Sequence, residues 1–264
     1  MTRPMHITSK SNGRLRDVRR LARRRAPDRF VIDGHRALRC ALTAGNRVLE
    51  VYAAPDLFLG DRDAEPIALA ARRGALVHHL SADAFRSVSG QVRADGLLAV
   101  VERPSTTLRE LGEFVVVADG IERPGNLGTV IRTAAAAGAD SVVACDVRTD
   151  VFHPEVVRGS VGAIFNVRVG VASTADAVAR LRRHRVVVAT PDASIPFWSA
   201  DYRGVTAVVV GSERHGVSAV WRRAAAQNVA IPLAEGADSL NVAVAAGVIL
   251  IEAARQRALP GSTR

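Results

Sequence analysis

Three segments in the second half of the chain place glycine beside charged and amide side chains, each after an apolar run. They cover residues 119–133, 211–216 and 231–244. Ligands bind at the carboxyl ends of strands in an open α/β sheet, so these segments are expected to share one site. Between them they supply a guanidinium, a carboxylate and an amide, on Arg132, Glu213 and Asn241. Such groups orient hydroxyls and hold anions by hydrogen bonding, and packing alone would not require them.

The first segment is expected to end in a helix that can bind an anion. Pro124, Gly125 and Gly128 would form tight turns before a helix over residues 129–137. The free N–H groups at such a helix start attract an anion. A Rossmann-type phosphate loop is excluded, because no G-x-G-x-x-G follows a strand in the sequence. A nucleotide-dependent oxidoreductase is therefore disfavoured.

The second and third segments each carry a polar group that has two interpretations. Glu213 follows the apolar run 207–210 and precedes Gly216, which fits a carboxylate at the sheet edge or a plain surface turn. Ser239 could cap a final helix expected to begin at Leu240. Asn241 would then lie inside an apolar first turn. A buried asparagine needs hydrogen-bond partners, so a ligand or a neighbouring loop is expected beside it.

Apolar runs and helical spacing predict the elements that position these segments. In the second half, strands are expected at 114–118, 141–145, 186–190, 206–210 and 228–231, with helices at 129–137, from 154, at 175–184, 218–226 and 240–257. The strands are continuous Val, Ala and Ile runs, which is typical of a parallel sheet covered on both faces. In the first half, strands at 30–32, 48–52, 76–79 and 97–101 alternate with helices at 35–44, 67–73 and 82–87. This alternation predicts a smaller α/β domain.

The linker between the two predicted domains is placed where this pattern breaks. Residues 102–107 read Glu-Arg-Pro-Ser-Thr-Thr, which interrupts the alternation of strands and helices. We therefore predict a first domain over 1–104, a linker over 105–112 and a second domain over 113–264.

The charge of the chain points to a polyanionic partner. Its formal net charge is +10, which favours nucleic acid over a membrane surface. Within residues 14–36, Leu15, Val18, Leu21 and Ala22 follow helical spacing, and arginines fall largely off that face. These arginines are Arg16, Arg19, Arg20, Arg23 and Arg24. The helix is interpreted as an RNA contact, with a merely solvated basic face as the alternative.

Several other classes of protein and site are disfavoured by the sequence. No apolar run reaches the roughly 20 residues of a membrane span, and no secretory signal is recognisable. Cys40 and Cys145 are expected to be reduced cysteines of a cytoplasmic protein. The histidines lack metal-ligand spacing, and His78 and His79 should point to opposite faces of a strand. No metal is therefore expected, and no Ser/His/Asp set is recognisable.

The three segments together resemble the SpoU/TrmH family of SPOUT RNA methyltransferases. The matching motifs are Asn126-Leu-Gly-Thr-Val-Ile-Arg132-Thr, Gly211-Ser-Glu213-Arg-His-Gly216 and Ile231-Pro with Asp238-Ser239-Leu-Asn241-Val, within about 113–257. The first half is similar to the L30e-like RNA-binding domain of ribosomal RNA members, on element order and the segment Phe30-Val-Ile-Asp-Gly34.

The resemblance implies a fold, a cofactor and a set of site residues. It implies a deep trefoil knot that binds S-adenosylmethionine in a bent form, and a homodimer whose active site is completed across the interface. The implied cofactor-binding residues are Gly211, Ile231 and Leu240, and Thr190, at the end of its strand, and Leu233 are further candidates. The implied catalytic residues are Arg132, Asn126, Glu213, Ser239 and Asn241.

The implied reaction is in-line attack of a ribose 2′-oxygen on the cofactor methyl group. Arginine stays protonated in proteins, so Arg132 is expected to stabilise the developing alkoxide and grip the adjacent phosphate. The first-half domain favours 23S ribosomal RNA as substrate, in a housekeeping or antibiotic-resistance role. A tRNA 2′-O-methyltransferase and a non-catalytic ribosome-assembly factor are the alternatives, and the complete set of motif residues argues against the second.

Overall fold

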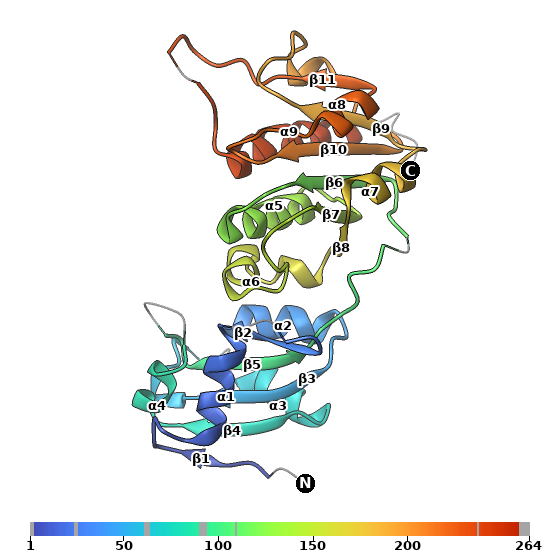
Figure 1. Ribbon diagram of the computed structural model, residues 1–264. Coiled ribbons are helices and arrows are strands. Elements are labelled where there is room, and N and C mark those ends of the chain that lie inside the picture. The colour runs from blue at the N-terminus through green and yellow to red at the C-terminus, as the bar shows by residue number, and fades with distance from the viewer. Residues whose placement is uncertain are drawn as a thin grey trace. The chain divides into compact units, whose positions relative to one another are not determined.

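The computed structural model describes residues 3–23, 26–60, 64–89, 94–108, 110–236 and 238–258. The chain divides into two compact units (Figure 1). Unit 1 comprises Met1–Pro104 and Phe152–Asn166, and unit 2 comprises Ser105–Val151 and Val167–Arg264. No helix in the described ranges is long and apolar enough to cross a membrane.

Unit 1 is built on a five-stranded mixed sheet in the order β1-β4-β3-β5-β2. Its strands are β1 (His6–Ile7), β2 (Arg29–Asp33), β3 (Val48–Ala53), β4 (Leu76–Leu80) and β5 (Leu97–Glu102). Its helices are α1 (Gly13–Leu21), α2 (His35–Thr43), α3 (Ala64–Arg72), α4 (Ala82–Arg86) and α6 (Pro154–Ser160), with short 3-10 turns η1 (Pro55–Leu57) and η3 (Ala163–Phe165). Strand β5 pairs antiparallel with both β2 and β3. The predicted alternation of strands and helices in this half is confirmed. The two-residue strand β1 was not predicted, because it is too short to show a pattern.

Helix α1 has the amphipathic character predicted from its spacing. The Asn12 side chain caps it by accepting a hydrogen bond from the Arg14 N–H at 2.9 Å. Leu15 and Val18 are fully buried in the unit 1 core. Burial of this apolar face fixes the helix, and the arginines therefore lie on its outer side.

Unit 2 contains a six-stranded sheet whose neighbouring strands all pair in parallel, as predicted. Its order is β11-β9-β10-β6-β7-β8. The strands are β6 (Phe114–Asp119), β7 (Ser141–Cys145), β8 (Arg168–Ala172), β9 (Arg185–Ala189), β10 (Thr206–Gly211) and β11 (Gln227–Val229). Strand β8 was missed, because it is an edge strand in which only Gly170 is buried, so it shows no continuous apolar run.

Helices cover both faces of this sheet. They are α5 (Pro124–Ala136), α7 (Thr174–Arg180), α8 (Ala219–Ala224) and α9 (Val242–Ala258), with the 3-10 turn η4 (Phe197–Ser199). Helices α7 and α8 pack on one face, and α5 and α9 pack on each other and on the opposite face. The parallel sheet enclosed by helices is therefore an α/β architecture with two layers of helix.

Two predicted helix starts in unit 2 are wrong. Helix α5 begins at Pro124, so Pro124, Gly125 and Gly128 are helical residues and do not form turns before it. Proline suits the first helical turn, and Gly128 is buried against the sheet side, where packing overrides its low propensity. Helix α9 begins at Val242, because Asn241 caps it: the Asn241 Oδ1 accepts from the Ala243 N–H at 2.9 Å.

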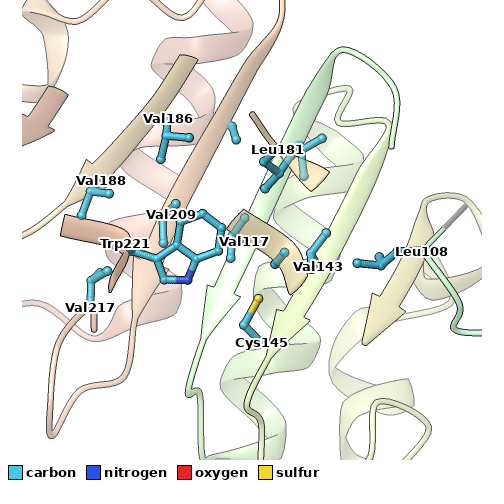
Figure 2. Packing of buried hydrophobic residues seen from close by; sticks show 13 residues of the cluster. Leu108, Val117, Val143, Cys145, Leu181, Val186, Val188, Val209, Val217 and Trp221 are labelled. Carbon is cyan, nitrogen blue, oxygen red and sulfur yellow. The ribbon is translucent and has the colours of Figure 1, made fainter. Parts of the chain in front are cut away.

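The unit 2 core lies between the sheet and helices α7 and α8 (Figure 2). Alternate residues of β6, β7, β9 and β10 point toward it, among them Val117, Val143 and Val209. Trp221 of α8 is completely buried at its centre. Burial also raises the pKa of the Cys145 thiol, with smaller contributions from Asp119 and Asp146, so this cysteine stays protonated at neutral pH. Because the core is closely packed, it fixes the positions of the strand ends on which the site is built.

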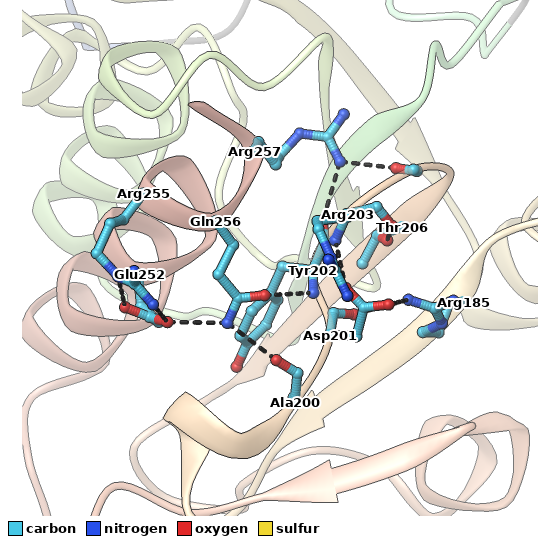
Figure 3. Close-up of polar contacts among 11 residues, drawn as sticks. Arg185, Ala200, Asp201, Tyr202, Arg203, Thr206, Glu252, Arg255, Gln256 and Arg257 are labelled. Carbon is cyan, nitrogen blue, oxygen red and sulfur yellow. Dashed lines mark hydrogen bonds and ion pairs between the residues drawn. The ribbon is translucent and has the colours of Figure 1, made fainter. Parts of the chain in front are cut away.

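The last turns of α9 are fixed to the segment that leads into β10 (Figure 3). The Gln256 side chain accepts from the Tyr202 N–H at 3.1 Å and donates to the Ala200 carbonyl at 3.0 Å. The Arg257 Nη1 donates to the Tyr202 and Gly204 carbonyls, at 2.9 and 2.6 Å. These contacts set the direction in which α9 runs back along the sheet.

Candidate functional site

Three amide and carboxylate side chains, far apart in the sequence, form one hydrogen-bonded chain in unit 2. The Asn126 Nδ2 on α5 donates to the Glu213 carboxylate, which follows β10. The Asn241 Nδ2, just before α9, donates to the Asn126 Oδ1 at 3.3 Å. The first, second and third segments singled out in the sequence therefore meet at the carboxyl edge of the sheet. Asn241 is exposed and was expected to be buried, because the helix begins after it.

A cavity of about 360 Å³ opens next to this chain, at the ends of β9, β10 and β11. Its lining includes all five residues expected to contact a cofactor, namely Thr190, Gly211, Ile231, Leu233 and Leu240. Glu213 and Ser239 also line it. Val229, Val242 and Ile249 make part of the wall apolar. A mostly apolar cavity with a few convergent polar groups is the usual form of a small-molecule site.

The loop after β10 is closed tightly over the cavity. Ser212 and Gly216 exchange two backbone hydrogen bonds, of 3.2 and 2.9 Å. A Cβ on Gly211 would lie 2.2 Å from the carbonyl carbon of Gly216, a distance that real structures do not tolerate. Glycine is therefore required at 211 because two backbone segments touch there. Gly216 itself has a φ of 64°, in the left-handed region.

Arg132 lies on the exposed side of α5, six residues beyond Asn126. Within the described part of the chain it has no hydrogen-bond or ion-pair partner, and it does not belong to the cavity lining. Ser239 is exposed and was expected to cap α9. The Asn241 side chain caps this helix in its place. The guanidinium of Arg132 is consequently free to meet a large ligand from outside this chain.

Asp119 is a site-supporting residue that sequence reasoning missed. It is 4% exposed at the end of β6. Its Oδ2 accepts from the Ser218 N–H at 2.7 Å, and its Oδ1 accepts from the Thr174 hydroxyl at 3.2 Å. It thereby holds the end of the 211–218 loop against the sheet. A single aspartate that ends an otherwise apolar strand was the available signal.

The basic helix of unit 1 presents most of its predicted arginines to solvent. Arg16, Arg20 and Arg23 are exposed, and Arg24 lies outside the described residues. Arg19 is half-buried and donates to the Lys10 carbonyl at 2.9 Å and the Ser87 hydroxyl at 3.4 Å. Arg20 forms an exposed ion pair with Asp17. Arg16 and Arg23 are thus the more available contacts for a polyanion.

The histidines do not form a metal centre in the described ranges. His78 is buried and His79 exposed, on opposite faces of β4 as expected. Burial, with Arg14 nearby, lowers the pKa of His78. No group of three His, Cys, Asp or Glu side chains among the described residues could hold a metal ion.

A parallel α/β sheet with a cavity at its strand ends and a polar chain beside the cavity is the usual arrangement of a small-molecule or cofactor site. Residues 113–251 match the SpoU rRNA Methylase family, which is more than half of the chain. The chain therefore belongs to the SpoU rRNA methylase family.

Relatives and solved structures agree with this assignment over nearly the whole chain. The 23S rRNA (guanosine(2553)-2′-O)-methyltransferase RlmP of Bacillus subtilis is 30% identical over 249 residues, 92% of this chain and 97% of the relative. The crystal structure of an RNA 2′-O ribose methyltransferase is 34% identical, with a TM-score of 0.85, and covers 97% of this chain and 100% of the other. An AdoMet-bound rRNA methyltransferase from Sinorhizobium meliloti is 29% identical, with a TM-score of 0.83. The match covers 95% of this chain and 97% of the other.

Proposed function

We propose that this protein transfers a methyl group from S-adenosylmethionine to a ribose 2′-hydroxyl of 23S ribosomal RNA. As a member of the SpoU family it is an S-adenosylmethionine-dependent RNA methyltransferase. The observation that carries the proposal is the hydrogen-bonded chain of Asn126, Glu213 and Asn241 beside the cavity. It joins the three motif segments at one edge of the sheet, where a cofactor and a ribose can meet.

The cavity fits the cofactor by its chemistry. Apolar walls from Ile231, Leu240 and Ile249 suit an adenine ring, and the backbone of the closed 211–216 loop offers hydrogen-bonding groups. We assign cofactor contacts to Gly211, Ile231, Leu240, Thr190 and Leu233. The segments that line the cavity would be the ones threaded through the trefoil knot of this family, holding the cofactor bent.

Arg132 is assigned the central catalytic role. S-adenosylmethionine, when bound, supplies the electrophilic methyl group. A ribose hydroxyl is a poor nucleophile until its proton leaves or its developing charge is stabilised. The Arg132 guanidinium stabilises the developing alkoxide and holds the neighbouring phosphate, while the hydroxyl proton passes to solvent water as the methyl group leaves the sulfonium sulfur for the 2′-oxygen. Asn126, Glu213, Ser239 and Asn241 orient the ribose and the arginine.

Ribosomal RNA is favoured over tRNA by the extent of the similarity. The 23S rRNA relative from Bacillus subtilis aligns with 92% of this chain, so the first half is included. We assign residues 1–104 as an L30e-like RNA-binding domain, 105–112 as a linker and 113–264 as the catalytic domain, although the compact unit 1 also includes residues 152–166 and unit 2 begins at Ser105. The exposed arginines of α1 and of the turn that follows it, Arg16 and Arg23 foremost, would bind RNA phosphates. The enzyme would act in the cytoplasm, where ribosomal RNA is found.

The functional form is proposed to be a homodimer. Val244, Val248 and Ile251 form an exposed apolar stripe along α9, with helical spacing. A second copy that covers this stripe would also bring its own surface near the site. Such a dimer explains why Arg132 stands outside the cavity of its own chain. The site is then completed by residues of both subunits.

The proposal is tested by methyl transfer to naked and ribosomal 23S RNA from a strain that lacks this protein. Tritiated S-adenosylmethionine should label one nucleotide of 23S RNA, and that nucleotide should resist alkaline hydrolysis because its 2′-oxygen is blocked. Labelling of tRNA in its place would establish the tRNA alternative. Cofactor binding without labelling of any RNA would contradict an enzymatic role. The mapped nucleotide would also separate a housekeeping function from protection against an antibiotic.

A further inference from the structure

Arg222 is a cation fixed in the wall of the cofactor cavity, outside the three family motifs. It stands on α8 and shares the lining with the polar side chains Glu213, Arg214 and His215. Those three belong to the exposed loop after β10. The Arg222 Nε donates to the Val217 carbonyl at 3.3 Å, and its Nη1 donates to the Asp192 Oδ2 at 2.7 Å. Of the cavity's cationic side chains, Arg222 is therefore the one held in place from two sides.

The Arg222 guanidinium still has donors for a ligand. Arginine carries five N–H groups in a planar fork, and the two contacts use the Nε and one of the Nη1 hydrogens. The Nη2 lies toward Gly216, since it is 3.8 Å from the point that a Cβ on that glycine would occupy. Gly216 is itself a lining residue. The free Nη2 of the guanidinium therefore lies beside a glycine that lines the same cavity.

The chemistry of the cofactor matches this edge. S-adenosylmethionine carries one carboxylate, at the end of its amino-acid portion, and arginine forms short, strong paired hydrogen bonds with carboxylates. Asp192 already shows that a carboxylate binds this guanidinium. Since Arg222 is ordered by its own contacts, it would lose little conformational entropy on binding a second carboxylate.

We propose that Arg222 binds the carboxylate of the amino-acid portion of S-adenosylmethionine, while Asp192 and the Val217 carbonyl hold the guanidinium in position. This inference rests on the cofactor assignment above and extends it to a residue outside the family motifs. It makes Arg222 a determinant of selectivity for the complete cofactor over molecules that contain its adenosine half alone.

Two ligands separate this role from a contact with the adenosine half. S-adenosylhomocysteine has the carboxylate, and 5′-methylthioadenosine keeps the adenine, ribose and sulfur but lacks the amino-acid portion. Binding of each to the full chain is measured by calorimetry. Arg222→Met should weaken the binding of S-adenosylhomocysteine about 10- to 100-fold, which is the loss typical of a charge-assisted hydrogen bond. The affinity for 5′-methylthioadenosine should stay within about 2-fold of the wild-type value. The affinity of Arg222→Lys for S-adenosylhomocysteine should lie between those of the wild type and Arg222→Met.

Arg223 supplies the matched control. It is the next residue on α8, is exposed and does not belong to the cavity lining, so Arg223→Met removes the same charge and should change neither affinity. Retained binding of 5′-methylthioadenosine shows that each variant is folded at the site. Equal losses for both ligands in Arg222→Met, or no loss for S-adenosylhomocysteine, would overturn the inference and leave the proposed function standing. A wild-type protein that binds neither ligand would overturn the cofactor assignment as well.

Discussion

Asp201 illustrates how a single side chain contributes to the stability of unit 2. It lies between Arg203, at 2.8 Å, and Arg185, at 2.7 Å (Figure 3). The hydrogen bond from Arg203, helped by Arg185 and opposed by partial burial, lowers the pKa of Asp201 from 3.8 to about 2. Because this pKa is lower in the folded chain than in the unfolded one, the ionised carboxylate stabilises the fold above about pH 4. That stabilisation is lost as the pH falls toward 2.

We expect Asp201→Asn to reduce the free energy of unfolding at pH 7 by less than about 1 kcal/mol, since the side chain is 40% exposed and water screens the pair. Urea unfolding at a series of pH values measures the effect. The difference between the wild type and the variant should narrow as the pH falls from about 4. A difference that is constant with pH would show that the carboxylate charge is not responsible.

At the residue scale, the sequence predicts polar groups that follow strands better than it predicts their partners. Glu213 and Asn241 stand out because a carboxylate and an amide are unexpected beside apolar runs, whereas Asn126 was expected only from the family resemblance. The pairing of Asn126 with Asn241 spans 115 positions and depends on strand order, which residue types do not encode. Asp119 and Arg222 were missed for the same reason: each acts through a partner brought near by the fold.

At the element scale, the loop after β10 is predicted to be intolerant of any side chain at its first residue. A Cβ at 211 would force Gly216 away, and the two Ser212–Gly216 hydrogen bonds would break. Gly211→Ala should therefore weaken S-adenosylhomocysteine binding by about 10-fold or more, with a smaller effect on unfolding because the loop is at the surface. Calorimetry and urea unfolding of one preparation test this together. Unchanged binding would mean that the loop can open without cost to the cofactor site.

The elements themselves were largely predictable, and the errors have physical causes. Continuous valine runs identify β6, β7, β9 and β10, because both faces of a parallel sheet are buried. The start of α5 was placed five residues late, since glycine and proline were interpreted as turn formers although both are tolerated in a packed first turn. Strand β8 lies at the sheet edge, where burial is partial and the apolar run is broken.

At the scale of the whole molecule, the exposed stripe of α9 predicts self-association. Val248→Glu places a charge at the centre of the stripe and should convert a homodimer to a monomer. Val205→Glu is the matched control, because Val205 is similarly exposed, at 41% against 36%, and lies outside α9. Sedimentation equilibrium of both variants measures the mass, and methyl transfer measures the consequence. If the wild type is a monomer, or if the Val248→Glu variant is still a dimer, this stripe is not the dimer interface.

The central claim is that an arginine on α5 and a cofactor in the cavity act on the same ribose. The most direct measurement compares Arg132→Ala with the wild type for methyl transfer to 23S RNA and for S-adenosylhomocysteine binding. Loss of one donor that stabilises a developing oxyanion typically costs about 100-fold or more in rate. We therefore predict at least that loss of methyl transfer, with cofactor affinity unchanged because Arg132 does not line the cavity. Methyl transfer at the wild-type rate in Arg132→Ala would contradict the account.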